Sequence, residues 1–327
     1  MTIILAIETT AHTFGVAVIK NGKILSNVKD AYTTESGGMI PLEVRKHHEK
    51  VSDKLYSKAL EEANVNEKDI DAIVFSNAPG LAPCLLAGME FVKRKAKKLQ
   101  LPIVKVNHCI AHVTIGETVG AKDAVMLYAS GANTQIIAYE AGKYRVFGET
   151  LDLGVGNFID TFARFSGLGF PGGPKIQILA EKGKKLIELP YSIKGMDMSF
   201  SGLQTKLKTL LDKGESLEDL SYSLQEYVFA MLVESAERAL AHTGKKELLL
   251  GGGVACNARL QEMCKIMCEE RGVKYFCPAR PLLVDNAGMI GYLGWKMFEA
   301  GVYTPIEKID DVDIDAKERT DMVEVSW

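Results

Sequence analysis

Two segments of this chain share one pattern, and that repeat constrains the fold more than any other feature of the sequence. Residues 3–25 predict an apolar strand, a Thr-rich turn, a second strand and an Asn-Gly hairpin turn. Residues 125–146 predict the same succession, and a one-residue gap aligns Gly22 with Gly142. A unit that recurs in this way indicates two related lobes.

Helices and further strands are expected between and after the hairpins. Helical patterns cover residues 48–65 and 84–100, and a buried strand is expected within 71–80. This alternation predicts an α/β fold with mixed sheets. Because 327 residues with 47 % hydrophobic content can bury two cores, we expect lobes at 1–125 and 126–327.

The first turn of each hairpin is rich in small and hydroxyl residues. Such turns present backbone N–H groups to an anion, as phosphate loops do. A plain hairpin turn would explain one such loop, but two at equivalent places favour anion binding. The second loop contains Tyr128, Ala129, Ser130, Gly131 and Ala132.

Two histidines stand four residues apart in the apolar stretch VNHCIAHV, which follows a predicted buried strand. On a helix, His108 and His112 project from one face, so both imidazoles can reach one metal ion. Histidines whose hydrogen bonds are satisfied in a core or at the surface are the alternative. A zinc protease would need glutamate directly after the first histidine, and this chain has Cys109 there.

Three further polar residues are candidates for binding. Asp160 is the odd polar residue in a helix whose phenylalanines, including Phe165, are expected to be core. Asn257 follows a glycine-rich strand end, and Asp285 precedes an apolar helix. Helix capping explains both of these, whereas a bound nucleotide or metal ion would use them as ligands.

Composition excludes several classes of protein. Six cysteines without a C-x-x-C pair favour a reducing compartment, and no uncharged apolar run is long enough to span a membrane. The sequence also starts without a signal-peptide pattern, so we expect a cytosolic protein. The net charge of −3 argues against a nucleic-acid binder that acts alone.

Nine motifs follow one another along the whole chain. They are IE-T-AHTFGV (7–16), NAPGLAPCL (77–85), VNHCIAH (106–112), LYASGANTQ (127–135), GNFID-FAR (156–164), PGGPKI (171–176), KGMDMSFSGL (194–203), GGGVACN (251–257) and VDNAGMI (284–290). Their order resembles the TsaD family, in the archaeal and eukaryotic branch found in the KEOPS complex. The resemblance implies an actin-like ATPase fold with nucleotide and metal between two lobes. It also implies transfer of a threonylcarbamoyl group from threonylcarbamoyl-AMP to the adenosine 3′ of a tRNA anticodon.

Carried over by position, the resemblance assigns one divalent metal ion, iron ahead of zinc, to His108, His112, Tyr128 and Asp285. It assigns ATP or threonylcarbamoyl-AMP to a second set of residues. Residues 128–132 would hold the acyl-phosphate. Asp160, Gly173 and Gln177 would contact the ribose, and Asn257 the base side.

The resemblance also implies partners: tRNA, a small kinase-like ATPase subunit, a dimerising subunit and a tRNA-tail-binding subunit, with no membrane. The basic run 92–100 is either a solvated helix face or a tRNA contact. A nucleotide-binding ATPase scaffold without activity alone is the second function, and a kinase-like activity is disfavoured by the histidine pair. The chain departs from the family pattern at Thr9, Ile40, Leu42, Leu86, Ala132 and Gln177.

Overall fold

The computed structural model describes residues 1–34 and 39–327, which form two compact units. The first unit combines Met1–Tyr32, Met39–Ile115 and Asp285–Trp327. The second consists of Thr33–Gly38 and Gly116–Val284. The expected lobes, 1–125 and 126–327, therefore need a correction, because the last 43 residues belong with the first unit.

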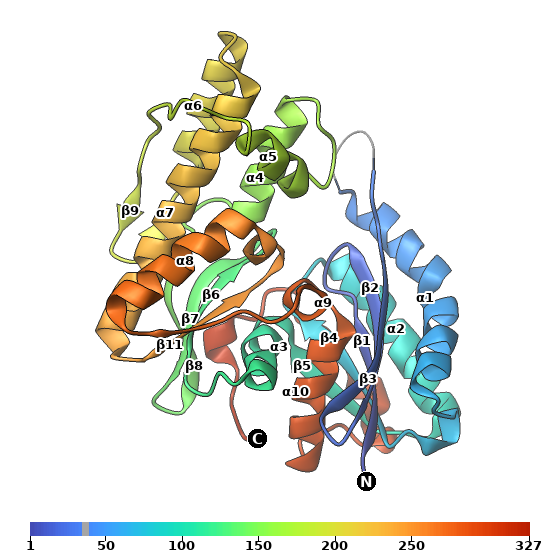
Figure 1. Ribbon diagram of the computed structural model, residues 1–327. Coiled ribbons are helices and arrows are strands. Elements are labelled where there is room, and N and C mark those ends of the chain that lie inside the picture. Colours follow the sequence, from blue (N-terminus) through green and yellow to red (C-terminus); the bar gives the residue numbers. More distant parts are fainter. Residues whose placement is uncertain (35–38) are drawn as a thin grey trace. The chain divides into compact units, whose positions relative to one another are not determined.

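The first unit is built on a five-stranded sheet in the order β3-β2-β1-β4-β5 (Figure 1). The first three strands pair antiparallel through the predicted hairpin, whose Asn21 and Gly22 both have positive φ. Strands β4 and β5 then add in parallel. The strands are β1 (Ile3–Glu8), β2 (Thr13–Lys20), β3 (Lys23–Ala31), β4 (Ala72–Ala78) and β5 (Ile103–Asn107).

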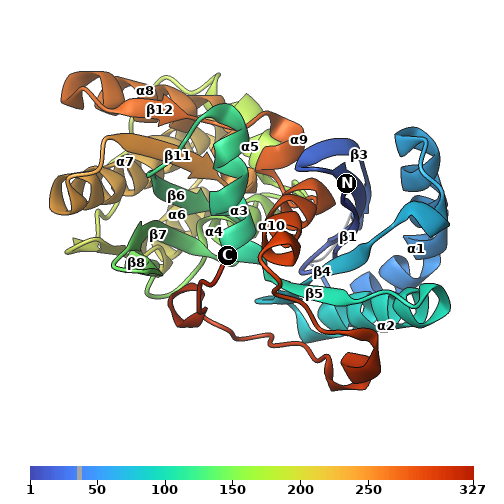
Figure 2. The same ribbon diagram turned by 90° about the horizontal axis from the view of Figure 1, so that it is seen from below.

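Helices cover both faces of this sheet, with α10 on one face and α1 and α2 on the other (Figure 2). The face under α10 requires glycine: a Cβ at Gly291 would lie 2.0 Å from Ile19, and one at Gly294 would lie 2.2 Å from Val74. The helices are α1 (Pro41–Ala63), α2 (Ala82–Leu99), α3 (His108–Thr114) and α10 (Ala287–Glu299), with 3-10 turns at Glu67–Asp69, Ile306–Asp311 and Thr320–Met322. Helix α1 thus begins seven residues before the predicted start at 48.

The sheet of the second unit repeats the first, with the order β12-β11-β6-β7-β8. Its hairpin strands are antiparallel and its last two strands are parallel, so the predicted repeat is confirmed at the level of topology. Ala141 and Gly142 take the positive φ values of the hairpin turn. The strands are β6 (Val125–Ala129), β7 (Thr134–Glu140), β8 (Lys143–Glu149), β11 (Glu247–Gly251) and β12 (Lys274–Phe276).

The helices of the second unit enclose its main core. Phe158 and Phe162 are fully buried there, but Phe165 is 39 % exposed, so the prediction that it belongs to the core is wrong. The helices are α4 (Val155–Phe165), α5 (Gly173–Ala180), α6 (Ser201–Asp212), α7 (Leu217–Thr243), α8 (Ala258–Arg271) and α9 (Arg280–Leu283), with 3-10 turns at Ile115–Val119 and Gly253–Cys256. A short hairpin, β9 (Ile193–Lys194) and β10 (Asp197–Met198), precedes α6.

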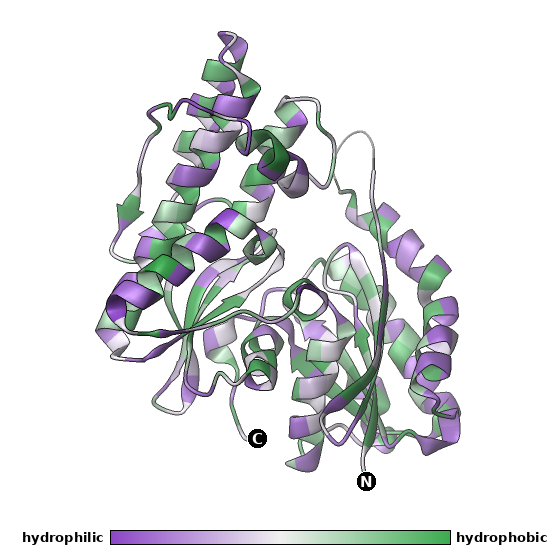
Figure 3. Cartoon of the chain, viewed as in Figure 1, coloured by the Kyte–Doolittle hydropathy of each residue, from purple (hydrophilic) through white to green (hydrophobic). Residues whose placement is uncertain are grey.

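Hydrophobic residues concentrate in the strands, and the helices alternate hydrophobic and hydrophilic positions (Figure 3). Each unit has its own cluster of buried apolar side chains. In the part of the chain that the structure describes, no helix combines the length and apolar character needed to cross a membrane.

Candidate metal centre and nucleotide loop

The two histidines lie on α3, the short helix that begins directly after β5, as the sequence predicts. Asn107 caps this helix by accepting hydrogen bonds from the backbone N–H groups of Cys109 and Ile110. His108 and His112 are one helical turn apart, both are buried, and their ring centroids are 4.8 Å apart. The cap and the strand end therefore fix where both imidazoles point.

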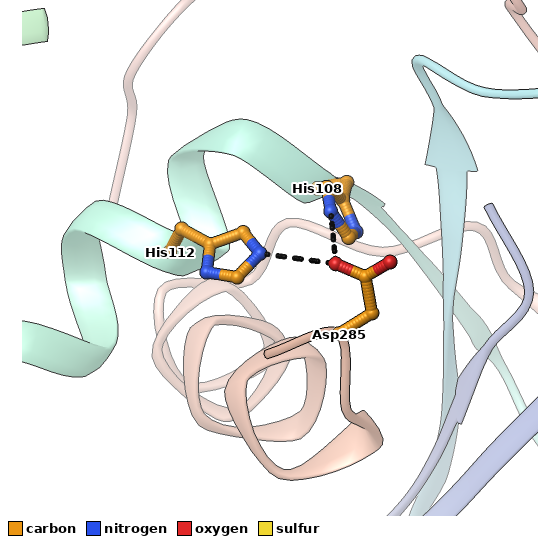
Figure 4. Close-up of side chains that lie close together, drawn as sticks. All are labelled: His108, His112 and Asp285. Atoms are coloured by element: carbon orange, nitrogen blue, oxygen red, sulfur yellow. Dashed lines mark ion pairs between the residues drawn. The ribbon is translucent and has the colours of Figure 1, made fainter. Parts of the chain in front are cut away.

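Asp285 completes a cluster with the two imidazoles inside the first unit (Figure 4). Its Oδ1 lies 3.4 Å from Nε2 of His108 and 3.5 Å from Nε2 of His112. One ligand atom from each residue falls within 4.8 Å of the others, so the three could hold one metal ion. The cap of α10 is Asn286, whose side chain accepts from the N–H of Met289, and this leaves the Asp285 carboxylate to face the imidazoles.

The two imidazoles have pKa values shifted in opposite directions. Burial opposes protonation of His108, but the carboxylates of Glu8 and Asp285 outweigh it and raise its pKa well above the usual value. Burial dominates at His112 and lowers its pKa. Burial likewise opposes ionisation of Asp285, yet hydrogen bonding to His108 holds its pKa well below the usual value. The cluster thus keeps an ionised carboxylate that attracts a cation.

Glu8 is a functional candidate that reasoning from the sequence missed. It is fully buried at the end of β1, and its Oε2 lies 3.0 Å from Nδ1 of His108. Its Oε1 accepts from both the backbone N–H and the hydroxyl of Thr10, at 2.7 and 2.5 Å. A carboxylate in this position binds Nδ1–H and directs Nε2 towards Asp285. The available signal was the single charge in the apolar run IILAIE.

The loop after β6 is held by backbone contacts. The N–H of Ser130 donates to the carbonyl of Asn133, while the carbonyls of Ser130 and Gly131 accept from the first turn of α4, at Gly156 and Asn157. Ala132, where the family pattern has glycine, is not among the described residues with positive φ. The methyl group therefore adds no backbone strain there.

Three glycines pack directly against this loop. A Cβ at Gly154 would lie 2.3 Å from the carbonyl oxygen of Gly131, and a Cβ at Gly156 would lie 2.7 Å from Gly131 Cα. Gly252 has a φ of +92°, and its Cβ would lie 2.3 Å from the carbonyl oxygen of Ala129. These glycines thus allow close packing against the loop backbone. From the sequence alone, this role could not be distinguished from contact with a ligand.

The expected ribose residues belong to α4 and α5. Asp160 Oδ1 accepts a hydrogen bond from the N–H of Gly172 at 2.7 Å, just before α5 begins at Gly173. A Cβ on Gly173 would meet nothing within 4 Å, so no neighbouring protein atom requires glycine there. Gln177 follows one turn later.

Asn257 and Tyr128, the expected base contact and metal ligand, both belong to the second unit. Asn257 caps α8 by accepting from the N–H groups of Arg259 and Leu260, and it donates to Gln225 Oε1 at 2.6 Å. Tyr128 is buried in β6 and belongs to the second unit, so its role as a metal ligand stays a prediction, as does the base contact of Asn257.

The remaining departures from the family pattern lie on the first unit. Thr9 faces Gly88 of α2, where a Cβ would come 2.1 Å from the threonine hydroxyl, so the two positions complement each other in size. Ile40 and Leu42 are exposed at the start of α1. The two glycines that open the GGMIPLE segment, Gly37 and Gly38, lie outside the described residues.

A family model described as TsaD, tRNA N6-adenosine threonylcarbamoyltransferase, matches residues 23–292. The chain belongs to the TsaD family. Proteins named tRNA N6-adenosine threonylcarbamoyltransferase are similar throughout: one from Thermococcus sibiricus is 53 % identical over 99 % of this chain and 100 % of its own length. One from Thermococcus kodakarensis is 54 % identical over 99 % of both chains.

A third relative, from Methanosarcina mazei, is named a probable bifunctional tRNA threonylcarbamoyladenosine biosynthesis protein. It is 49 % identical over the whole of this chain, which spans 60 % of that longer protein. The TsaD-like part of the relative is therefore joined to a further segment.

Solved structures confirm the actin-like ATPase fold. HypF of T. kodakarensis superposes with a TM-score of 0.63 at 14 % identity, over 92 % of this chain and 48 % of its own. Component A of the Acidaminococcus fermentans (R)-2-hydroxyglutaryl-CoA dehydratase gives 0.57 at 15 % identity, over 90 % and 98 %. At these identities the likeness extends to the fold alone.

Proposed function

We propose that this chain transfers the threonylcarbamoyl group of threonylcarbamoyl-AMP to N6 of the adenosine 3′ of a tRNA anticodon. The observation that carries this proposal is similarity to named transferases over 99 % of the chain, combined with an intact His-His-Asp cluster. The name of each relative describes that relative, and the His-His-Asp cluster of this chain supports the same chemistry here.

The cluster suits a divalent transition metal. Two imidazoles and a carboxylate are donors that iron and zinc both accept, and we propose iron ahead of zinc from the family resemblance. Tyr128 is proposed as the fourth ligand. When bound, such an ion supplies Lewis-acid polarisation of a carbonyl or phosphoryl oxygen. The residues' own contribution is preorganisation: Glu8 orients His108, and α3 holds His112 beside Asp285.

The nucleotide would lie against the second unit. We propose that residues 128–132 hold the acyl-phosphate of threonylcarbamoyl-AMP or the phosphates of ATP, since their backbone is fixed by three close glycines. Asp160, Gly173 and Gln177 would contact the ribose, and the open space beside Gly173 suits close approach of a sugar. Asn257 would lie on the base side.

Partners and location follow from the resemblance. We propose tRNA as substrate and cooperation with a small kinase-like ATPase, a dimerising subunit and a tRNA-tail-binding subunit in the cytosol. The bifunctional name of the longer Methanosarcina relative supports a link between this enzyme and a second protein of the same process. The second candidate, a nucleotide-binding scaffold without activity alone, is favoured only by the substituted family positions.

Reconstitution with tRNA and threonylcarbamoyl-AMP tests the proposal. His108→Ala combined with His112→Ala should abolish metal binding and lower turnover about hundredfold or more, because a Lewis acid supplies several kcal/mol to the barrier. His47→Ala combined with His242→Ala changes two histidines outside the cluster and should keep both properties. If the cluster variant retained metal and turnover, the metal-assisted scheme would be abandoned. A wild-type chain that binds nucleotide but never transfers the group supports the scaffold.

A further inference from the structure

Two segments of the second unit carry only basic charged side chains, although the chain as a whole is acidic. Residues 161–180 and 201–211 contain cationic side chains and no aspartate or glutamate, in a chain with a net charge of −3. These segments cover the end of α4, the loop that follows it, α5 and most of α6. The cations are Arg164, Lys175, Lys206 and Lys208, and all four are exposed.

These segments meet in space. Helix α4 contacts both α5 and α6, and the three helices lie together in the second unit (Figure 1). Lys208 of α6 places its ammonium 5.2 Å from the ring centroid of Phe165 at the end of α4. Lys175 of α5 donates to the carbonyl of Leu168 in the loop after α4. These contacting helices thus each carry a cation, and Lys208 lies against the exposed ring of Phe165. We call Arg164, Phe165, Lys175, Lys206 and Lys208 the α4–α6 patch.

The cations of the patch form no ion pairs within the described residues. Among residues 1–34 and 39–327, none of the four lies within ion-pair distance of a carboxylate, and Arg164 reaches only the hydroxyl of Thr161. Helix α2 of the first unit shows the opposite case: Arg94, Lys97 and Lys98 each face an aspartate or glutamate. The positive field of the patch is thus available to an external anion, whereas that of α2 is compensated.

The exposed ring of Phe165 indicates which class of anion the patch would bind. Phe165 is 39 % exposed, with a cation beside it, and this combination suits an unstacked base flanked by phosphates. An isolated phosphate or a nucleotide would not need four cations spread over three helices. A single-stranded RNA loop supplies both bases and a run of charges.

The patch also adjoins the residues proposed to hold the donor. Arg164 follows Asp160 by one turn of α4, and Lys175 lies between Gly173 and Gln177 on α5. An acceptor base must come close to the donor carbonyl, so its neighbouring nucleotides have to pass near these two helices. We propose that the α4–α6 patch binds the anticodon loop of tRNA, with its cations on phosphates and Phe165 against an unstacked base. This inference rests on the proposed function.

Salt-dependent binding of a synthetic anticodon stem–loop RNA to the full-length chain tests the proposal. Arg164→Gln with Lys208→Gln should reduce the slope of log affinity against log salt by about 2, because each lost phosphate contact removes about one unit. Phe165→Ala should weaken binding about tenfold at every salt concentration, since stacking does not depend on counterions. Both variants should keep the wild-type melting temperature and the wild-type affinity for ATP.

The control removes the same charge elsewhere on the second unit. Lys143→Gln with Lys246→Gln changes two exposed lysines that have no carboxylate partner among the described residues, and it should leave the slope unchanged. Equal slopes for wild type, patch variant and control would overturn the proposal, as would a wild-type chain that does not bind the RNA at low salt. Patch variants that bind RNA normally but lose a protein partner would identify a protein interface and also overturn it. RNA binding through the patch without threonylcarbamoyl transfer leaves this inference standing and removes the proposed function.

Discussion

At the scale of single residues, the metal cluster depends on side chains that are not ligands. Glu8 has no solvent exposure, and the backbone N–H and hydroxyl of Thr10 fix one of its oxygens while the other faces His108 Nδ1. An ionised carboxylate there raises the electron density on the opposite ring nitrogen and sets the direction of its lone pair. The affinity of the cluster for a metal ion should therefore depend on Glu8.

Glu8→Gln should weaken metal binding by about 10-fold to 100-fold, because the amide keeps the shape but removes the charge. The measurement is a competitive titration of Zn²⁺ or Co²⁺ against a chelator. Glu49→Gln, which alters an exposed carboxylate on α1, is the control and should match the wild type. Equal affinities for Glu8→Gln and wild type would show that the contact is structural only.

His48 should make the stability of the first unit dependent on pH. Burial lowers the pKa of this histidine to about 4, although its hydrogen bond to the carbonyl of Ala11 opposes the shift. The unfolded chain binds the proton with a pKa near 6.5, so protons favour the unfolded state between these values. Stability should be complete above pH 6.5 and fall by about 3 kcal/mol as the pH drops to 4.

Denaturant unfolding at pH 7.5 and pH 4.5 measures this loss, with His48→Gln as the comparison. The glutamine amide can still donate to Ala11 but does not titrate, so the variant should lose less stability than the wild type over this interval. An identical loss in both proteins would place the titration elsewhere.

At the scale of structural elements, the loop after β6 depends on glycines in other elements. Gly252 combines a φ of +92° with a backbone oxygen 2.3 Å from the position of a Cβ, whereas Gly253 has open space around it. Gly252→Ala should cost about 2 kcal/mol or more and lower nucleotide affinity, because the loop must shift. Gly253→Ala is the matched control. Thermal melts with and without ATP separate the two, and equal behaviour of both variants would contradict this prediction.

The basic run on α2 should contribute little to tRNA binding, in contrast to the possibility raised by the sequence. Lys97 faces Asp310 at 2.7 Å, so the pair presents no net charge to an approaching phosphate. Lys97→Gln together with Asp310→Asn should change the affinity for tRNA by less than about twofold. A tenfold loss of tRNA affinity in a filter-binding assay would contradict this prediction and indicate that α2 contacts RNA.

Sequence patterns predicted many of the structural elements and site residues but missed some of them. The spacing of His108 and His112 and the apolar stretch before them predicted a helix after a buried strand, since both depend on local periodicity. Local sequence alone favoured capping at Asp285, and only the family resemblance assigned it to a metal ion; in the structure the cap is Asn286, one residue later. Glu8 was missed because a contact across 100 residues leaves no mark on local spacing.

At the scale of the whole molecule, the two units differ in how the chain builds them. The second is almost continuous in sequence, whereas the first is assembled from both ends of the chain. Composition and periodicity predicted two units but did not predict that residues 285–327 belong to the first unit. Helix α10 packs on the first sheet through close contacts at Gly291 and Gly294, and such contacts depend on three-dimensional shape rather than on local sequence.

The continuous unit should fold by itself. A fragment of residues 116–284 contains a complete five-stranded sheet and its own apolar core, so it should melt cooperatively. A fragment of residues 1–115 lacks α10 and should remain largely unfolded, because one face of its sheet is uncovered. Circular dichroism during heating measures both, and a cooperative melt of 1–115 would contradict the role given to α10.

The late position of Asp285 has a consequence for biosynthesis. A ribosome translates both histidines and Glu8 long before the carboxylate of Asp285, because residues 116–284 of the second unit lie in between. A polypeptide that ends before residue 285 contains both imidazoles but lacks the carboxylate of the cluster. We therefore expect the complete chain to retain a metal ion more tightly than a chain that ends before Asp285.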